Sequence, residues 1–216
     1  IMKPPYCLEK NFHKLCSHKM EIPIFPLNGA VLFPGTNIPL NIFEDRYIEM
    51  VDYALANKRY IGMIQLDDKN RLYKIGCLGK INSFSETNDG RYLINLSGSN
   101  CFEVNKELKE KYKFRMVSAN ILPENDNNYE FGDVERTKLI NNYKNFIKVK
   151  NINIDLNEIE KIELDQLIKF IAMVSPFKDV EKQSLLETKN VFEFYNKLIS
   201  IIELETFEIQ ENKSIN

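Results

Sequence analysis

The sequence contains only two histidines, His13 and His18, and both precede Glu21. A serine or cysteine nucleophile that uses a histidine base needs that base within hydrogen-bond reach. The chain from Glu21 onward therefore excludes a Ser-His-Asp or Cys-His active site. A Ser-Lys dyad is formally possible, because serine and lysine are both plentiful, but the sequence has no nucleophile segment like Gly-Pro-Ser-Ala-Gly, and we expect no catalytic residue.

The chain also lacks a strong charge of either sign and any long apolar run. Its formal net charge is -2, so no bulk attraction draws it to nucleic acid or to an anionic membrane. No apolar stretch approaches the roughly 20 residues that a membrane-spanning helix needs. The first residues lack the apolar core of a secretory signal. We expect neither nucleic acid nor a membrane as a partner.

Cysteine is scarce and widely spaced. The four cysteines are Cys7, Cys16, Cys77 and Cys101. No two of them form a Cys-x-x-Cys pair, and this usage is typical of reduced thiols in a cytoplasmic protein. Cys7 and Cys16 alternate with the two histidines, but the spacing of this cluster matches no common structural zinc site. We expect no metal, and we interpret residues 1–20 as a poorly ordered leader whose removal up to residue 19 leaves the fold intact.

Gly76, Gly79 and Lys80 resemble part of a phosphate-binding loop, but their spacing is wrong. That loop needs four residues between its glycines and a serine or threonine after the lysine. Here two residues separate the glycines, and Ile81 follows Lys80. We interpret the glycines as small residues that allow close packing of a strand, and we expect no nucleotide or other cofactor.

The first half of the chain has the spacing of short strands. Pro34-Gly35 and Asn88-Asp89-Gly90 are strong turn signals. The expected elements are strands at 22–25 and 38–42, a helix over 44–57, and strands between 60 and 122, with RYLINLSG and CFEVNKEL as separate strands. This pattern predicts a small antiparallel barrel or sandwich.

After a polar linker at 124–133 the spacing becomes helical. Apolar residues at three- and four-residue steps predict helices over 134–149, 156–174 and 180–204. Asp155 and Asp179 are expected to cap the second and third of these helices.

Two runs of charge have structural explanations. The densest basic run, which glutamates interrupt, predicts a charged hairpin turn; its members are Lys106, Lys109, Lys111, Lys113 and Arg115. An acidic run predicts a solvated helix face and not a cation site; its members are Asp155, Glu158, Glu160, Glu163 and Asp165.

The aromatic-rich opening is the most informative segment for binding. Its large apolar residues near loops are Phe25, Leu32, Phe33, Phe43 and Tyr47. One interpretation places most of them in the core, and the other places some along an apolar groove that accepts hydrophobic segments of unfolded proteins. The candidate protein-contact residues are Leu32, Phe33, Phe43 and Tyr47. Prolines between 23 and 39 deny N–H groups to neighbouring strands, so we expect this region at a free sheet edge.

Several motifs, in order along the chain, resemble the Lon protease N-terminal domain. They are Phe25-Pro26-Leu27, Phe33-Pro34-Gly35, Pro39-Leu40, Ile42-Phe43-Glu44 with Arg46-Tyr47, the run from Ile75 to Gly79, Asp89-Gly90-Arg91, Leu96-Ser97-Gly98, and the run from Glu181 to Glu187. The resemblance extends from about Glu21 to about Leu204.

The resemblance implies an α+β fold, with a PUA-like β pseudo-barrel at 21–123 and a helical bundle at 134–206. It also implies a non-enzymatic module that grips unfolded or degron-bearing polypeptides, without the ATPase and protease domains, and with a protease or chaperone as a candidate partner. PUA-like folds also include RNA binders, so an RNA-binding module is the alternative.

Overall fold

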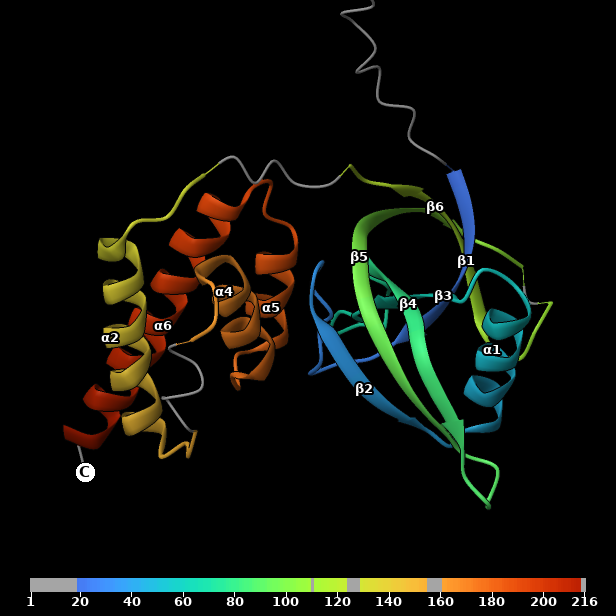
Figure 1. The fold of residues 1–216 in the computed structure, drawn as a ribbon, viewed down its shortest axis with the longest axis horizontal. Coiled ribbons are helices and arrows are strands. Elements are labelled where there is room, and N and C mark those ends of the chain that lie inside the picture. Colours follow the sequence, from blue (N-terminus) through green and yellow to red (C-terminus); the bar gives the residue numbers. More distant parts are fainter. Residues whose placement is uncertain (1–18, 110, 124–128, 155–160, 215–216) are drawn as a thin grey trace, which may run out of the picture.

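The computed structural model describes residues 19–109, 111–123, 129–154 and 161–214, and it has an α+β fold (Figure 1). The elements are β1 (Lys19–Pro26), β2 (Asn37–Ile42), α1 (Asp45–Ala56), β3 (Tyr60–Ile64), β4 (Ile75–Glu86), β5 (Tyr92–Glu107), β6 (Arg115–Ile121), α2 (Asp133–Lys150), α4 (Leu164–Val174), α5 (Asp179–Leu186) and α6 (Val191–Ser214). The predicted fold class is confirmed. Within the described residues, all strands precede Leu122 and all helices but α1 follow Gly132.

The six strands form one sheet in the order β2-β5-β4-β3-β1-β6, and β6 pairs back to β5. This last pairing closes a circuit of five strands, β5, β4, β3, β1 and β6. β2 pairs with β5 outside the circuit. All pairings are antiparallel except that of β1 with β3, which is parallel from Ile24 opposite Gly62 to Pro26 opposite Ile64. The prediction of an antiparallel arrangement was wrong for this one pair. The chain passes through β2 and α1 between the two strands, and a parallel pair requires such a long crossover.

Side chains from all five strands of the circuit meet in one apolar cluster. Its buried members are Ile22, Ile24, Ile64, Leu78, Phe102, Val117 and Ala119. A Cβ on Gly62 or on Gly76 would overlap the ring of Phe102. The predicted role of Gly76 is confirmed, because a small residue there lets β4 approach the phenylalanine closely.

The strand β5 is a single element where the sequence predicted two. The predicted hairpin turn before it is present, with Gly90 at φ +79 and the amide of Thr87 bonded to the carbonyl of Arg91. Beyond Gly98 the chain stays extended but exchanges β2 for β6 as its neighbour. The pairing of β5 with β4 shifts its register on either side of Gly98. Such irregularities curve a strand without ending it.

The proline-rich opening is only partly at a sheet edge. β2, which carries Pro39, pairs with β5 alone within the described sheet and is an edge strand. β1 lies between β3 and β6, so the prediction of an edge was wrong for this strand. Pro23 is tolerated because the pairing of β1 with β3 begins only at Ile24, which leaves Pro23 a partner on one side. β1 also begins at Lys19, so the last two residues of the expected leader belong to the sheet; residues 1–18 lie outside the described residues.

The helical half differs from the prediction at two boundaries. α4 begins at Leu164, and residues 161–163 are not helical. The carbonyl of Ile162 accepts a hydrogen bond from Arg136 of α2 at 2.9 Å. The rest of the expected start, including Asp155, lies outside the described residues. The third predicted helix is two helices, α5 and α6. Asn190 starts the second, because its Oδ1 accepts from the amide of Glu193 at 2.8 Å.

The helices form a group beside the sheet, with α5 and α4 nearest the strands and α2 on the far side (Figure 1). One large apolar cluster runs from the face of the sheet into this group and includes Leu32, Phe33, Leu185 and Phe194. α1 covers a different part of the sheet and buries Tyr47, as its predicted apolar spacing requires. No described helix is long and apolar enough to cross a membrane.

Candidate functional site

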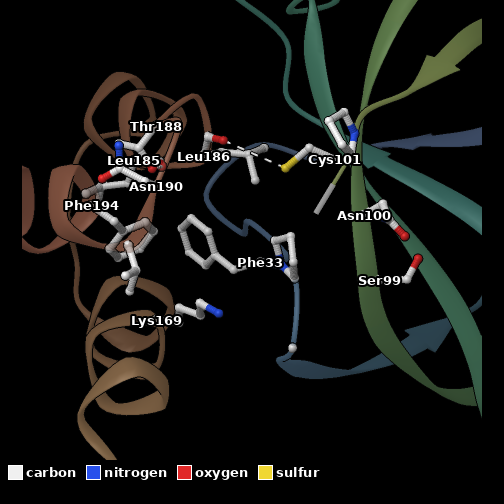
Figure 2. A pocket seen from close by; sticks show the side chains of 14 residues that line it. Phe33, Ser99, Asn100, Cys101, Lys169, Leu185, Leu186, Thr188, Asn190 and Phe194 are labelled. Atoms are coloured by element: carbon white, nitrogen blue, oxygen red, sulfur yellow. Dashed lines mark hydrogen bonds between the residues drawn. The ribbon is translucent and has the colours of Figure 1, made fainter. Parts of the chain in front are cut away.

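A cavity of about 200 Å³ lies where the sheet meets the helices (Figure 2). Its lining residues from the sheet side are Phe33, Pro34, Gly35, Ser99, Asn100, Cys101 and Pro123. Those from the helical side are Lys169, Leu185, Leu186, Thr188, Asn190, Val191 and Phe194. Neither half of the chain could form this cavity alone.

The sheet wall of the cavity depends on a tight turn at Phe33-Pro34-Gly35. Gly35 has φ +83, a conformation that favours glycine, and its amide bonds to the carbonyl of Gly98 at 2.9 Å. The hydroxyl of Thr36 donates to the carbonyl of Phe33 at 2.8 Å and so closes the turn. A Cβ on Gly98 would overlap the carbonyl of Phe33, so only glycine allows β5 to lie this close. The turn is therefore held rigidly against the strand.

The apolar floor of the cavity joins the two halves through aromatic rings. Phe33 is 1% exposed, and its ring meets that of Phe194 edge-on, with centroids 5.3 Å apart at 81°. Leu185, Leu186 and Val191 continue this surface from α5 and the start of α6. An edge-to-face ring pair contributes about 0.5–1.5 kcal/mol beyond its buried area.

A polar seam beside the cavity fixes α5 against the strands. The amide of Gly29 donates to Oδ1 of Asp179 at 3.0 Å, and Nζ of Lys182 donates to the carbonyl of Gly29 at 3.0 Å. Nε2 of Gln183 donates to the carbonyl of Ile75 in β4 at 3.1 Å. The prediction that Asp179 caps this helix was wrong, because Asp179 is the first residue of α5 and Lys178 occupies the capping position. The carboxylate of Asp179 instead accepts the hydrogen bond from Gly29 across the junction.

The electrostatic character of the cavity comes from one lysine. Figure 2 shows Lys169 reaching from α4 toward the segment of Phe33, while Cys101 points from β5 toward Leu186. The lining contains no aspartate or glutamate. Burial raises the pKa of Cys101 to about 11, although the nearby charge of Lys169 acts in the opposite direction. Its thiol donates to the carbonyl of Leu186, with Sγ and O 3.8 Å apart.

The four predicted contact residues do not form one surface. Leu32 and Tyr47 are buried, and Tyr47 packs edge-on against Phe25 with ring centroids 4.5 Å apart. Leu32 is buried because the loop after β1 turns inward onto the core, whereas Tyr47 is on the buried face of α1. Phe33 is also buried but lines the cavity. Phe43 is 63% exposed at the end of β2 and lies apart from the cavity.

Lys169 and Cys101 were not predicted as site residues. Leu185, Leu186 and Phe194 were expected only as the buried face of a helix. The signal for Lys169 was present, since it is the one charge within the apolar run LIKFIAMV. No local pattern indicated that Lys169 and Gly35 would be neighbours, because the two residues meet only through the tertiary fold.

The remaining candidate sites have simple structural explanations. The described residues contain no group of three His, Cys, Asp or Glu side chains that could hold a metal ion. The Cys7, His13, Cys16 and His18 cluster lies outside the described residues. In the basic run, Arg115 binds the carboxylate of Glu107 through two nitrogens at 2.5 and 2.8 Å, and this bond stabilises the predicted charged hairpin.

Comparison with known proteins gives a consistent family. The family model of the ATP-dependent protease La (LON) substrate-binding domain matches residues 21–203. A Lon protease of Buchnera aphidicola is 30% identical over 209 residues, which is 92% of this chain and 27% of that protein. A Lon protease of Flavobacterium johnsoniae is 27% identical over 81% of this chain and 23% of its own length. The chain thus spans about a quarter of the length of these relatives.

Solved structures share the fold. A Lon N-terminal domain protein from Xanthomonas campestris superimposes with a TM-score of 0.63 at 20% identity, covering 84% of this chain and 98% of that one. The N-terminal domain of the Mycobacterium avium complex Lon protease gives a TM-score of 0.61 at 18% identity, covering 85% and 98%.

Proposed function

The chain belongs to the family of LON substrate-binding domains, and from this we propose that it is a protein-binding module that recognises polypeptides and catalyses no reaction itself. The observation that carries the proposal is the cavity between sheet and helices. Its apolar floor is built from rigid parts, and a preformed apolar site loses little conformational entropy when it binds a side chain.

The proposal extends to unfolded or degron-bearing chains as clients. The exposed ring of Phe43 offers a second apolar contact on the β side. Apolar contacts are non-directional, so affinity for many sequences should be weak and tolerant of sequence. The Lon proteases similar to this chain are about four times as long, and protease activity is no part of the proposal.

Two further points belong to the proposal. We place the protein in the cytoplasm, because four widely spaced cysteines without a Cys-x-x-Cys pair are typical of reduced thiols there. We rank RNA binding second. Glutamates interrupt the basic run, and Arg115 within it is paired with Glu107, so the run offers phosphate a mixed surface of both charges.

The test is binding of a permanently unfolded model protein, carboxymethylated α-lactalbumin, followed by fluorescence anisotropy. Pro123 is exposed at the rim of the cavity, so Pro123→Trp should narrow the entrance without unfolding the protein. We expect binding to weaken about tenfold, or about 1.4 kcal/mol. Val134→Trp, at an exposed site on α2, is the matched control and should leave binding unchanged.

Absence of binding by the unaltered protein would contradict the proposed function. Equal binding by the Pro123→Trp and Val134→Trp variants would show that the model protein binds elsewhere than at the cavity. Hydrolysis of ATP or of the model protein by the purified chain would contradict the non-enzymatic part. A salt-dependent gel shift with RNA would favour the second candidate.

A further inference from the structure

The cavity combines an apolar floor with one cation and no anion. We propose that it binds the C-terminal residue of a polypeptide, with the free α-carboxylate at Lys169 and an apolar last side chain against Phe33 and Phe194. This inference rests on the proposed function and names the chemical class of the client that this cavity takes.

The first step concerns Lys169. Within the described residues, its ammonium has neither a hydrogen bond nor an ion pair to any protein group. The ammonium lies 3.7 Å from the position that a Cβ on Gly35 would occupy, so it is at the turn that forms the sheet wall. Partial burial of a cation without a partner is costly, and a carboxylate is the partner that removes this cost with a charge-assisted hydrogen bond.

The second step concerns charge complementarity. None of the lining residues carries a negative charge, so nothing in the cavity competes with an incoming carboxylate for Lys169. The other polar lining groups are hydroxyl and amide side chains, which include Thr188 and Asn190. The pocket therefore favours an anionic group over a cationic or neutral polar one.

The third step concerns size and shape. A cavity of about 200 Å³ is smaller than the roughly 300–1,000 Å³ of sites that enclose whole small molecules. The cavity has room for one side chain together with the α-carboxylate of the same residue. In the last residue of a chain, the carboxylate and the side chain leave the same Cα, so both reach their partners only if the cation lies next to the apolar floor. Figure 2 shows this arrangement, with Lys169 beside Phe33.

The experiment compares two fluorescein-labelled Gly-Ser peptides that end in Phe-Leu, one with a free carboxylate and one with a C-terminal amide. A third peptide carries an internal Glu before Phe-Leu and ends in an amide. We expect the full chain to bind the free acid about tenfold more tightly than the amide, since a hydrogen bond to a charged group contributes at least this much. The Glu peptide should bind like the amide, because its carboxylate leaves a different Cα.

The variant that tests the cation is Lys169→Gln, and Lys148→Gln is the matched control at an exposed site on α2. Lys169→Gln should abolish the preference for the free acid, and Lys148→Gln should retain it. Neither substitution should lower the urea unfolding midpoint. Equal affinity for acid and amide, equal affinity for the Glu peptide and the free acid, or a preference that survives Lys169→Gln would overturn the inference. If these results came with intact binding of carboxymethylated α-lactalbumin, the proposed function would stand and only the client class would fall.

Discussion

The ammonium of Lys182 donates a hydrogen bond to the carbonyl of Gly29 at 3.0 Å, although 153 positions separate the two residues. The amide of the same glycine donates to Asp179, so one helix holds both backbone groups of Gly29. Lys182 also donates to the carbonyl of Met173 at 3.3 Å. These bonds fix α5 against the loop after β1, and through α5 they set the helical wall of the cavity.

Lys182→Met should therefore destabilise the fold. The lysine is 5% exposed, and its loss would leave the carbonyls of Gly29 and Met173 without this donor. A buried polar group left unsatisfied costs about 1–3 kcal/mol, which urea unfolding would detect as a lower midpoint. Lys189→Met, at an exposed position just after α5, should change stability by less than about 0.5 kcal/mol. Similar midpoints for the two variants would show that the junction does not depend on Lys182.

Phe33→Ala and Phe43→Ala should separate a core residue from a surface residue. Phe33 is 1% exposed, so its truncation should cost about 3–5 kcal/mol of unfolding free energy. Phe43 is 63% exposed, and Phe43→Ala should change stability by less than about 0.5 kcal/mol. If Phe43 contacts clients, this variant should still bind carboxymethylated α-lactalbumin more weakly. Unchanged stability together with unchanged binding would remove Phe43 from the list of contact residues.

The sequence predicted local elements well where one periodicity held throughout. α1 is an example, because Tyr47, Met50, Val51 and Ala54 are all buried as their spacing required. The break between α5 and α6 was missed although no apolar residue lies between Leu186 and Val191. The capping pair of Asn190 and Glu193 was a readable signal there.

The candidate site was predicted less well, for a physical reason. The cavity is formed by residues that meet only when the helices pack on the sheet, and periodicity describes only one element at a time. The sequence favoured loop aromatics as contacts, yet the loop after β1 folds inward and buries Leu32. Proximity of Lys169 to Gly35 depends on how α4 is placed, which no local pattern encodes.

Glu205 should make stability depend on pH in the acid range. Its side chain is 6% exposed and lies 2.7 Å from Nζ of Lys150 and 3.4 Å from Nζ of Lys178. Burial by itself would raise the pKa of Glu205, but the two lysines outweigh burial and lower this pKa below its ordinary value. A carboxyl with a lowered folded pKa adds stability above its unfolded pKa of about 4.3 and loses that stability as pH falls through the folded pKa.

Glu205→Gln should therefore lower the unfolding midpoint at pH 7 and flatten its decline between about pH 5 and 3. Glu208→Gln is the matched control, since Glu208 lies 3.6 Å from Lys178 but is 47% exposed. Urea titrations across this pH range measure the effect. If the unfolding midpoint fell equally steeply with decreasing pH in the unaltered protein and in Glu205→Gln, the lowered pKa assigned to Glu205 would be contradicted.

Cys101 should react slowly with iodoacetamide, at a rate that rises steeply with pH. The thiolate is the reactive form, and burial raises the pKa of Cys101 to about 11. At pH 8 only about one thiol in a thousand would be ionised, and the rate should rise about tenfold for each pH unit up to about pH 11, if the protein stays folded.

The measurement needs a Cys7→Ser, Cys16→Ser background and mass spectrometry of the labelled peptide. Cys77, which is 0% exposed, is the internal control and should stay unlabelled while the protein is folded. Lys169→Gln should slow the reaction of Cys101 further, because the lysine charge favours the thiolate. Alkylation of Cys101 at pH 8 as fast as that of the urea-unfolded chain would mean that this thiol is open to water in the folded protein, and would contradict its burial at the cavity wall.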